Sequence, residues 1–156
     1  MGLLTPLAVK IGSVGWMPRL LPQITWVDKL LQRGSCGRWS LLRVAGLPNL
    51  MLVVAGRKSG VPRSTPLLCV PYRNGYLIAG SNFGGLKEPV WVVNVRAADR
   101  VTVVVGAERR EAIAREVTGE ERAVVWEHMV KTWPNYALYA ARTDRMIPVF
   151  FLEPVA

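Results

Sequence analysis

Histidine and cysteine are scarce in this sequence, which contains one histidine, His128, and two cysteines, Cys36 and Cys69. The cysteines lie far apart and form no CxxC pair, so neither a disulfide framework nor a zinc site is indicated. A Ser-His-Asp or multi-histidine mechanism would have to act through one imidazole, and GxSxG, HExxH, GxGxxG and GxxxxGK[ST] motifs are absent. We therefore expect no metal, and the cysteine usage favours a reducing, cytoplasmic compartment.

Negative charge is missing from a long stretch of the chain, because no carboxylate occurs between Asp28 and Glu88. Residues 1–87 carry 11 Lys or Arg and one acid, whereas residues 88–156 carry 9 and 10, so +10 and −1 sum to the net charge of +9. An anion that docks in the first half therefore meets no repulsion. A nucleic acid, a lipid headgroup and a phosphorylated cofactor all fit this charge. The few aromatics among the cations, Trp39 and Tyr72, do not form a stacking platform, so we expect no nucleic acid partner.

Long apolar runs are also absent. The longest, around residues 50–55, is far shorter than the roughly 18 residues that a membrane-spanning helix needs. Within residues 16–33, apolar residues recur at helical spacing between basic ones, and a continuous helix would begin near Pro22 and end by Gly34. We expect residues 1–33 to be a helical extension of a single domain covering residues 1–156. Two interpretations stay open: this helix packs on its own domain, or it lies on an anionic membrane surface, peripherally on the inner face of the cell membrane.

The rest of the chain predicts an α+β fold. Short β-rich runs and hairpin signals, such as Asn74-Gly75 and Gly106, alternate with three helical segments. The predicted strands are 50–56, 64–72, 76–80, 101–105, 108–117 and 147–152, and the predicted helices are 90–97, one that opens at a Thr118–Glu121 capping box, and 135–142. We expect about six mainly antiparallel strands, closed into a small barrel so that no long edge remains.

Three features can carry chemistry. The segment 56–64 combines three cations, two glycines and two hydroxyls in a turn between strands, which suits a phosphate or carboxylate cradle as well as a solvated basic turn. The loop 80–85 is rich in glycine and precedes Trp91 and Asn94, where the tryptophan stacks on a flat ligand or fills the core. The third feature places Trp133, Tyr136 and Tyr139 on one helix face, with two hydroxyls that can donate protons.

These residues resemble the deazaflavin-dependent nitroreductase family within the split-barrel flavin and deazaflavin oxidoreductases. The resemblance runs from about residue 40 to the C-terminus, and its motifs occur in the family's order: Gly56-Arg57-Lys58-Ser59-Gly60, Pro66-Leu67, Ser81-Asn82, Gly84-Gly85, Pro89-x-Trp91-x-x-Asn94-x-Arg96 and Arg142-Thr143-Asp144-Arg145-x-Ile147-Pro148-Val149. It implies a split β-barrel that binds coenzyme F420, with FMN less favoured. It also implies hydride transfer from the reduced coenzyme to a quinone, a nitroaromatic or another apolar acceptor.

Carried over by position, the resemblance assigns a role to each matching residue. The phosphate and glutamate tail would be held by Arg57, Lys58, Ser59 and Arg63. The edge of the bound chain would be lined by Ser64, Thr65, Pro66, Leu67 and Leu68, and the ring by Ala79, Gly80, Ser81, Asn82, Val90, Trp91, Val92, Val93, Asn94 and Tyr136. Trp133, Tyr136, Tyr139 and Ser81 would line the acceptor cleft, where Tyr136 or Tyr139 would protonate the reduced acceptor.

The chain departs from the family pattern at two places. Glu88-Pro89 stands where the family usually has His-Pro, and Val92-Val93 stands where a Tyr-His pair is common. An acid near an anionic ligand opposes binding, and two valines remove hydrogen-bonding groups. The alternative prediction is therefore a non-catalytic lipid-binding or fatty-acid-binding protein on the same barrel. The sequence predicts a monomer or a homodimer without choosing between them.

Overall fold

The computed structural model describes residues 23, 26, 27, 30 and 48–155 of the chain. The four described residues of the N-terminal segment are helical and exposed. The rest of the predicted extension, and with it the predicted membrane surface, lies outside the described residues. No described helix is long and apolar enough to cross a bilayer.

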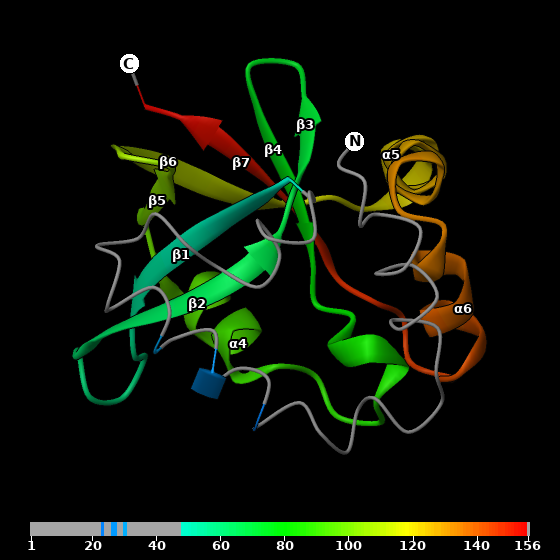
Figure 1. The fold of residues 1–156 in the computed structure, drawn as a ribbon, viewed down its shortest axis with the longest axis horizontal. Helices are drawn as coiled ribbons and strands as arrows, with labels where there is room; N and C mark the ends of the chain where they lie inside the picture. The colour runs from blue at the N-terminus through cyan, green and yellow to red at the C-terminus, as the bar shows by residue number, and fades with distance from the viewer. Residues whose placement is uncertain (1–22, 24–25, 28–29, 31–47, 156) are drawn as a thin grey trace.

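Seven antiparallel strands form one curled sheet, in the order β2-β1-β5-β6-β7-β4-β3 (Figure 1). Their bounds are β1 Asn49–Ala55, β2 Pro62–Leu68, β3 Val70–Tyr72, β4 Gly75–Ala79, β5 Val101–Val105, β6 Glu108–Glu116 and β7 Val149–Pro154. The α+β class and the antiparallel split-barrel architecture are thus confirmed. The structure has seven strands where about six were expected, because the predicted strand 64–72 divides at Cys69 into β2 and β3.

Cys69 closes one corner of the curled sheet. The chain passes through this single residue from one edge strand, β2, to the other, β3. Its backbone N–H donates to Pro48 O at 3.1 Å, just before β1 begins. Because β2 and β3 do not pair with each other, the outer edge of the seven-residue strand β2 has no strand partner among the described residues. The expectation that closure leaves no long edge was therefore wrong.

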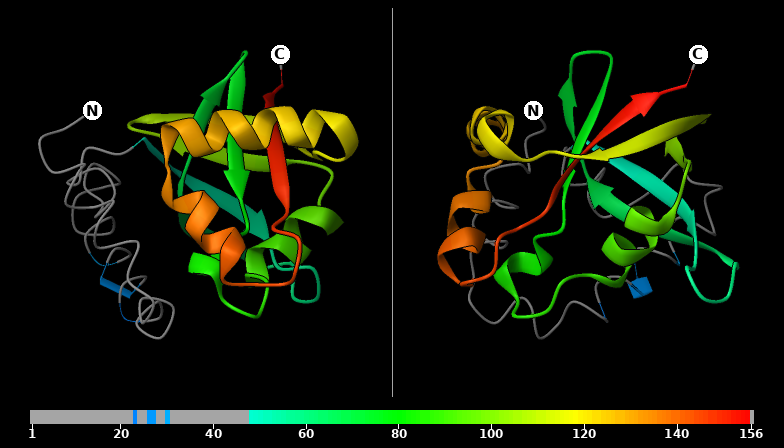
Figure 2. Two further views of the ribbon diagram at one scale, coloured as in Figure 1. Left: turned by 90° about the vertical axis from the view of Figure 1, so that its right-hand side faces the viewer. Right: turned by 180° about the vertical axis from the view of Figure 1, so that it is seen from behind.

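Three helices and one short 3-10 turn cover the sheet: α4 Val90–Ala97, α5 Gly119–Thr132, α6 Asn135–Ala141 and η1 Asn82–Gly84. Figure 2 shows α5 and α6 on the same side of the sheet, away from α4. The core divides accordingly. One cluster joins Trp91, Val92 and Val95 of α4 to β1, β5, β6 and β7, and the other joins α5 and α6 to β3, β4 and β7.

The strand β7 belongs to both clusters. Phe150 and Leu152 enter the α4 cluster, whereas Val149 and Phe151 enter the α5–α6 cluster. Since both faces of the strand are covered, four successive apolar residues are buried instead of alternating with polar ones. This arrangement explains the continuous apolar run that predicted the closing strand.

The predicted capping box at the start of α5 does not form. Thr118 occupies the N-cap position, but its side chain makes no capping hydrogen bond. The Glu121 carboxylate instead accepts two hydrogen bonds from Arg115 of β6, at 2.8 and 3.0 Å. A bidentate charged partner thus replaces the backbone amide that the box would have used.

Candidate functional site

The basic turn, which we define as residues 56–61, joins β1 to β2. Gly56 N–H donates to Val61 O at 2.9 Å, and Gly60, whose φ is +69°, donates to Gly56 O at 2.8 Å. The turn leaves Arg57 and Lys58 exposed, and Arg63 of β2 is exposed beside it. No carboxylate of the described residues pairs with any of these three cations. Their charges are therefore available to an anion.

Asn94 of α4 fixes the basic turn. Its side chain is buried, and its Oδ1 accepts the backbone N–H of Arg57 at 3.0 Å. A buried amide oxygen that is already engaged with the turn orients the turn's backbone. The sequence assigned Asn94 to the ring of the coenzyme, and that role stays a prediction beside this contact.

The remaining α4 residues form the wall behind the site. Trp91 and Val92 are buried in the α4 core cluster, Val93 is half-buried, and Val90 is exposed. The Trp91 ring lies 5.8 Å from that of Phe150. A Cβ at Gly80 would lie 2.7 Å from Val92 Cγ2, so the small residue at position 80 lets β4 approach α4 closely. This close packing against Gly80 explains in structural terms why a valine stands at position 92.

The strand β2 is the outer edge beside the basic turn. Within residues 48–155 it pairs only with β1, in a register that sets Ser64 opposite Val53 and Pro66 opposite Met51. Ser64 is exposed, and residues 65–68 are half-buried. The residues predicted to line the coenzyme's chain thus follow an open strand edge that starts at the three available cations.

The segment 80–85 is a strained turn that follows β4. Asn82 and Phe83 have φ values of +46° and +52°, and Gly84 has +78°. Two consecutive non-glycine residues in the left-handed region are unfavourable and require support from their surroundings. A Cβ at Gly84 would lie 2.6 Å from Tyr139 O, which brings the turn against α6. Ala79 and Ser81 at the start of the turn are half-buried.

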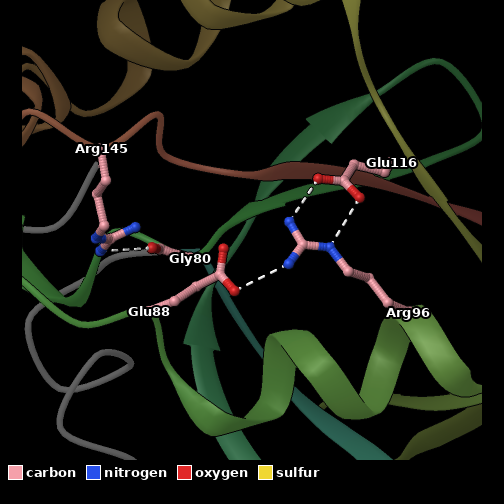
Figure 3. Close-up of polar contacts among 5 residues, drawn as sticks. All are labelled: Gly80, Glu88, Arg96, Glu116 and Arg145. Carbon is pink, nitrogen blue, oxygen red and sulfur yellow. Dashed lines mark hydrogen bonds and ion pairs between the residues drawn. The ribbon is translucent and has the colours of Figure 1, made fainter.

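Arg145 supports this turn from the loop between α6 and β7. Its Nη2 donates to Gly80 O at 3.1 Å and Ser81 O at 3.0 Å, and its Nε donates to Gly85 O at 3.0 Å (Figure 3 draws the Gly80 contact). Its Nη1 is buried without a hydrogen-bond partner among the described residues. The resemblance contained Arg145 in a motif, but sequence reasoning gave it no role because contacts across 60 positions leave no local signal.

The three aromatic residues predicted on one helix face are buried together, but only Tyr136 and Tyr139 lie on one helix, α6, because Trp133 has an extended backbone after α5. The Tyr136 and Tyr139 rings meet edge to face with centroids 6.1 Å apart, and Trp133 precedes them at the end of α5. Burial raises the pKa of both tyrosines above the usual value, so both hydroxyls keep their protons at neutral pH. The polar groups of Trp133 and Asn135 near the Tyr139 hydroxyl partly offset that shift in its pKa, although neither meets the geometry of a hydrogen bond to it.

Besides Arg145 Nη1, two buried polar atoms near the turn have no hydrogen bond within the described part of the chain: Asn82 Oδ1 and the Tyr139 hydroxyl oxygen. Because the amide nitrogen of Asn82 donates to Lys87 O at 3.0 Å, the Oδ1 is the atom of this side chain that has no partner. The Phe83 ring contacts Tyr139 with centroids 5.5 Å apart, so the two groups belong to one region. Unsatisfied buried polar atoms are costly, and a ligand that offers partners would remove that cost.

Glu88 is not a free acid. Arg96 of α4 donates to Glu88 Oε2 through Nη1 at 2.9 Å, and to both oxygens of Glu116 through Nη2 and Nε at 2.8 and 3.0 Å. These ion pairs raise the pKa of Arg96, and the hydrogen bond from Arg96 lowers that of Glu116. Figure 3 shows Glu88 between Arg96 and Arg145. Burial lowers the pKa of Arg145, and the charge of Glu88 partly offsets this lowering. The acid that departs from the family pattern is therefore ion-paired, although it shares the single charge of Arg96 with Glu116.

The structure joins the three candidate features into one continuous region. Asn94 connects α4 to the basic turn, Val92 connects α4 to Gly80, and Gly84 connects the strained turn to Tyr139. His128 is exposed and lies elsewhere, with Nε2 3.2 Å from Pro71 O. No group of three or more His, Cys, Asp or Glu that could hold a metal occurs in the described ranges.

Comparisons with known proteins agree on one family. The family model of F420H(2)-dependent quinone reductases matches residues 29–154. An F420H(2)-dependent quinone reductase of Mycobacterium tuberculosis is 30% identical over 141 residues, which cover 88% of this chain and 95% of that protein. A solved F420-H2 dependent reductase, FDR-A, is 39% identical with a TM-score of 0.63, over 68% of this chain and 94% of that one. A domain-swapped dimer is 36% identical with a TM-score of 0.66, over 82% and 94%.

Proposed function

Because this chain belongs to the F420H(2)-dependent quinone reductase family, we propose that it transfers a hydride from reduced coenzyme F420 to an apolar, electron-poor acceptor, with quinones the first choice. The observation that carries this proposal is the cluster of Arg57, Lys58 and Arg63, which lack anionic partners in the described part of the chain. Their position beside an open strand edge suits an extended polyanion better than a compact one.

The residues present fit the coenzyme in two respects. The phosphate and glutamate carboxylates of F420 match the three available cations, with charge-assisted hydrogen bonds of the kind that arginine and lysine give to such groups. The edge of the deazaflavin ring carries both N–H and C=O groups. Asn82 Oδ1 can accept from such an edge, and the Tyr139 hydroxyl can donate to it.

In this proposal the chain holds the coenzyme and orients it. Lys58 and Arg63, with Arg57 and Ser59, hold the anionic tail, and residues 64–68 line its path along β2. Residues 79–82 contact the ring on one side, with residues 90–94 and Tyr136 on the others. When bound, reduced F420 supplies the hydride. Ser81, Trp133, Tyr136 and Tyr139 exclude water from the acceptor.

The acceptor needs a proton as well as a hydride, since a quinone becomes a hydroquinone. Burial raises the pKa of Tyr136 and Tyr139, so each hydroxyl carries its proton at the pH of the reaction. We assign the proton transfer to Tyr136, with Tyr139 as the second candidate. Solvent then returns a proton to the tyrosine that donated one.

Titration of the full-length protein with oxidised F420 at low and high salt, followed by the coenzyme's fluorescence, tests the proposal. We expect micromolar binding that weakens with salt. Lys58→Ala with Arg63→Ala should weaken binding by roughly 1.5–3 kcal/mol for each charged hydrogen bond lost. The matched control, Arg73→Asn with Lys131→Ala, removes the same charge away from the basic turn. Figure 1 shows the β3–β4 hairpin, which carries Arg73, at the opposite end of the sheet.

Binding should be followed by an assay of quinone reduction with reduced F420 under anaerobic conditions. Equal affinity of the double variant and the wild type at low salt would contradict the assignment of the basic turn. No binding at any salt would overturn the reductase and favour the lipid-binding alternative, which extraction of copurifying lipid would then examine.

A further inference from the structure

We propose that Arg145 is a positioning residue that holds the strained turn 80–85 in shape and at a fixed place relative to α6. The purpose of that shape, the presentation of Ser81 and Asn82 to the coenzyme ring, rests on the proposed function. The mechanical role itself follows from the contacts of the described residues and needs no ligand.

The turn needs outside support because its own hydrogen bonds are few. Gly84 N–H donates to Ser81 O and Gly85 N–H donates to Asn82 O, each at 2.8 Å. These two bonds must offset the unfavourable left-handed backbone of two non-glycine residues, Asn82 and Phe83. Such a conformation persists only where its surroundings impose it.

The Arg145 guanidinium imposes this left-handed conformation through contacts at both ends of the turn. Its Nη2 contacts the carbonyls of Gly80 and Ser81 before the left-handed residues, and its Nε contacts the carbonyl of Gly85 after them. One rigid, planar group therefore sets the separation of the two ends of the turn. A lysine ammonium keeps the charge but concentrates its donors on one atom, so it cannot reproduce this span.

The position of Arg145 in the chain extends the effect to the aromatic residues. It follows α6 by a few residues, and Arg142, at the end of α6, adds a hydrogen bond from Nη1 to Phe83 O at 3.3 Å. The loop after α6 thus holds the turn through two arginines, while Gly84 packs on Tyr139 O. The placement of Ser81 relative to Tyr136 and Tyr139 depends on these contacts.

Amide hydrogen exchange on the protein without coenzyme tests the mechanical role. In Arg145→Lys, we expect the Gly84 and Gly85 amides to exchange about tenfold faster, as the loss of one or two charged hydrogen bonds predicts. The Trp133 amide, bonded to Met129 O at the end of α5, should not change. Arg115→Lys, which alters an arginine paired with Glu121 elsewhere, is the matched control. Unchanged exchange at Gly84 and Gly85 in Arg145→Lys would overturn the proposal.

Kinetics then separates positioning from binding. Arg145→Lys should lower kcat about tenfold or more, while the Kd for oxidised F420 changes less than about threefold. The Lys58→Ala with Arg63→Ala variant should show the reverse pattern, with a larger change in Kd than in kcat. A Kd effect as large as the kcat effect would contradict positioning. Thermal melting of Arg145→Lys and Arg145→Ala accompanies both measurements, and if the alanine variant fails to fold, the lysine variant decides. If the wild type binds no F420, the proposed function fails, but the exchange data still decide the role of Arg145.

Discussion

The Arg57 backbone N–H and the Asn94 side-chain oxygen form a 3.0 Å hydrogen bond across 37 positions of sequence. Through it, a buried residue of α4 controls a solvent-exposed turn whose cations have no described anionic partner. The affinity of the basic turn for an anion should therefore depend on α4 as well as on the cations themselves.

Asn94→Ala should loosen the basic turn. Loss of the acceptor leaves the Arg57 N–H without its partner, which costs about 1–3 kcal/mol of unfolding free energy. Asn94→Asp keeps an acceptor at the same place and is the control. Urea unfolding measures the stability, and exchange of the Arg57 amide reports the turn. Equal stability of the alanine and aspartate variants would contradict this role.

Arg96 should screen the charge of Glu88 from the coenzyme. Glu88→Gln alone is expected to change the Kd for F420 little, because the Glu88 carboxylate is already ion-paired with Arg96. Arg96→Met should weaken binding more, and adding Glu88→Gln should restore it, with a coupling of about 0.2–1 kcal/mol for these partly exposed groups. Additive effects of the two changes in the double-mutant cycle would rule out the screening.

Tyr136→Phe should lower turnover more than coenzyme affinity. Removal of a positioned proton donor typically costs about 10²–10⁴-fold in rate, whereas the buried ring keeps its packing. Because burial raises the Tyr136 pKa above its usual value, the wild-type rate should show no loss from ionisation of this tyrosine as the pH rises toward 10. Tyr76→Phe, in β4, is the control. Turnover of Tyr136→Phe equal to that of the wild type would remove Tyr136 as the donor.

Gly84→Ala should destabilise the protein far more than Gly106→Ala. Both glycines have positive φ, +78° and +61°, so alanine is strained at either. Only at position 84 would the added Cβ also meet backbone, at 2.6 Å from Tyr139 O, whereas nothing lies within 4 Å at position 106. We expect about 1–2 kcal/mol for Gly106→Ala and at least about 3 kcal/mol for Gly84→Ala. Similar midpoints of urea denaturation for the two variants would contradict the close approach.

Cys69 should make the protein less stable in alkali. Burial raises the pKa of its thiol to about 12, whereas the thiol of the unfolded chain titrates near 9. Between these values the unfolded chain has lost a proton that the folded chain keeps, so the unfolding free energy falls as the pH rises above 9, by about 1.4 kcal/mol per pH unit. Comparison of Cys69→Ala with the wild type between pH 8 and 11 isolates this contribution. The same pH slope in both proteins would show that the thiol is not involved.

Local sequence signals predicted the parts of the fold that depend on local physics. Pro89 marked the start of α4 at Val90, Gly106 marked the β5–β6 turn, and the apolar run 149–152 marked a strand. The sequence did not predict the break at Cys69, because β-propensity continues through it and the closing of the sheet causes the bend. It also did not predict that Arg115 would draw Glu121 away from its capping position.

The features of the candidate site also divide into those that the sequence predicted and those that it did not. The cations of the basic turn were evident from composition and spacing, and the absence of acids made them conspicuous. The contacts that shape the basic turn and the turn 80–85 were not evident from the sequence, since Asn94 and Arg145 act on residues 37 to 65 positions away. Asn82 and Phe83 gave no signal either, because neither residue type favours a left-handed backbone as strongly as glycine does.

The strand at the centre of both core clusters, β7, is also the last strand of the chain. During synthesis, β4 and β6 lack their shared neighbour until residues 149–154 leave the ribosome, and both core clusters stay incomplete until then. Folding is therefore deferred until β7 has been synthesised, and every pairing with β7 closes a long loop. Until β7 has been synthesised, nascent chains of this protein expose apolar strands, so their need for chaperones is greatest before that point.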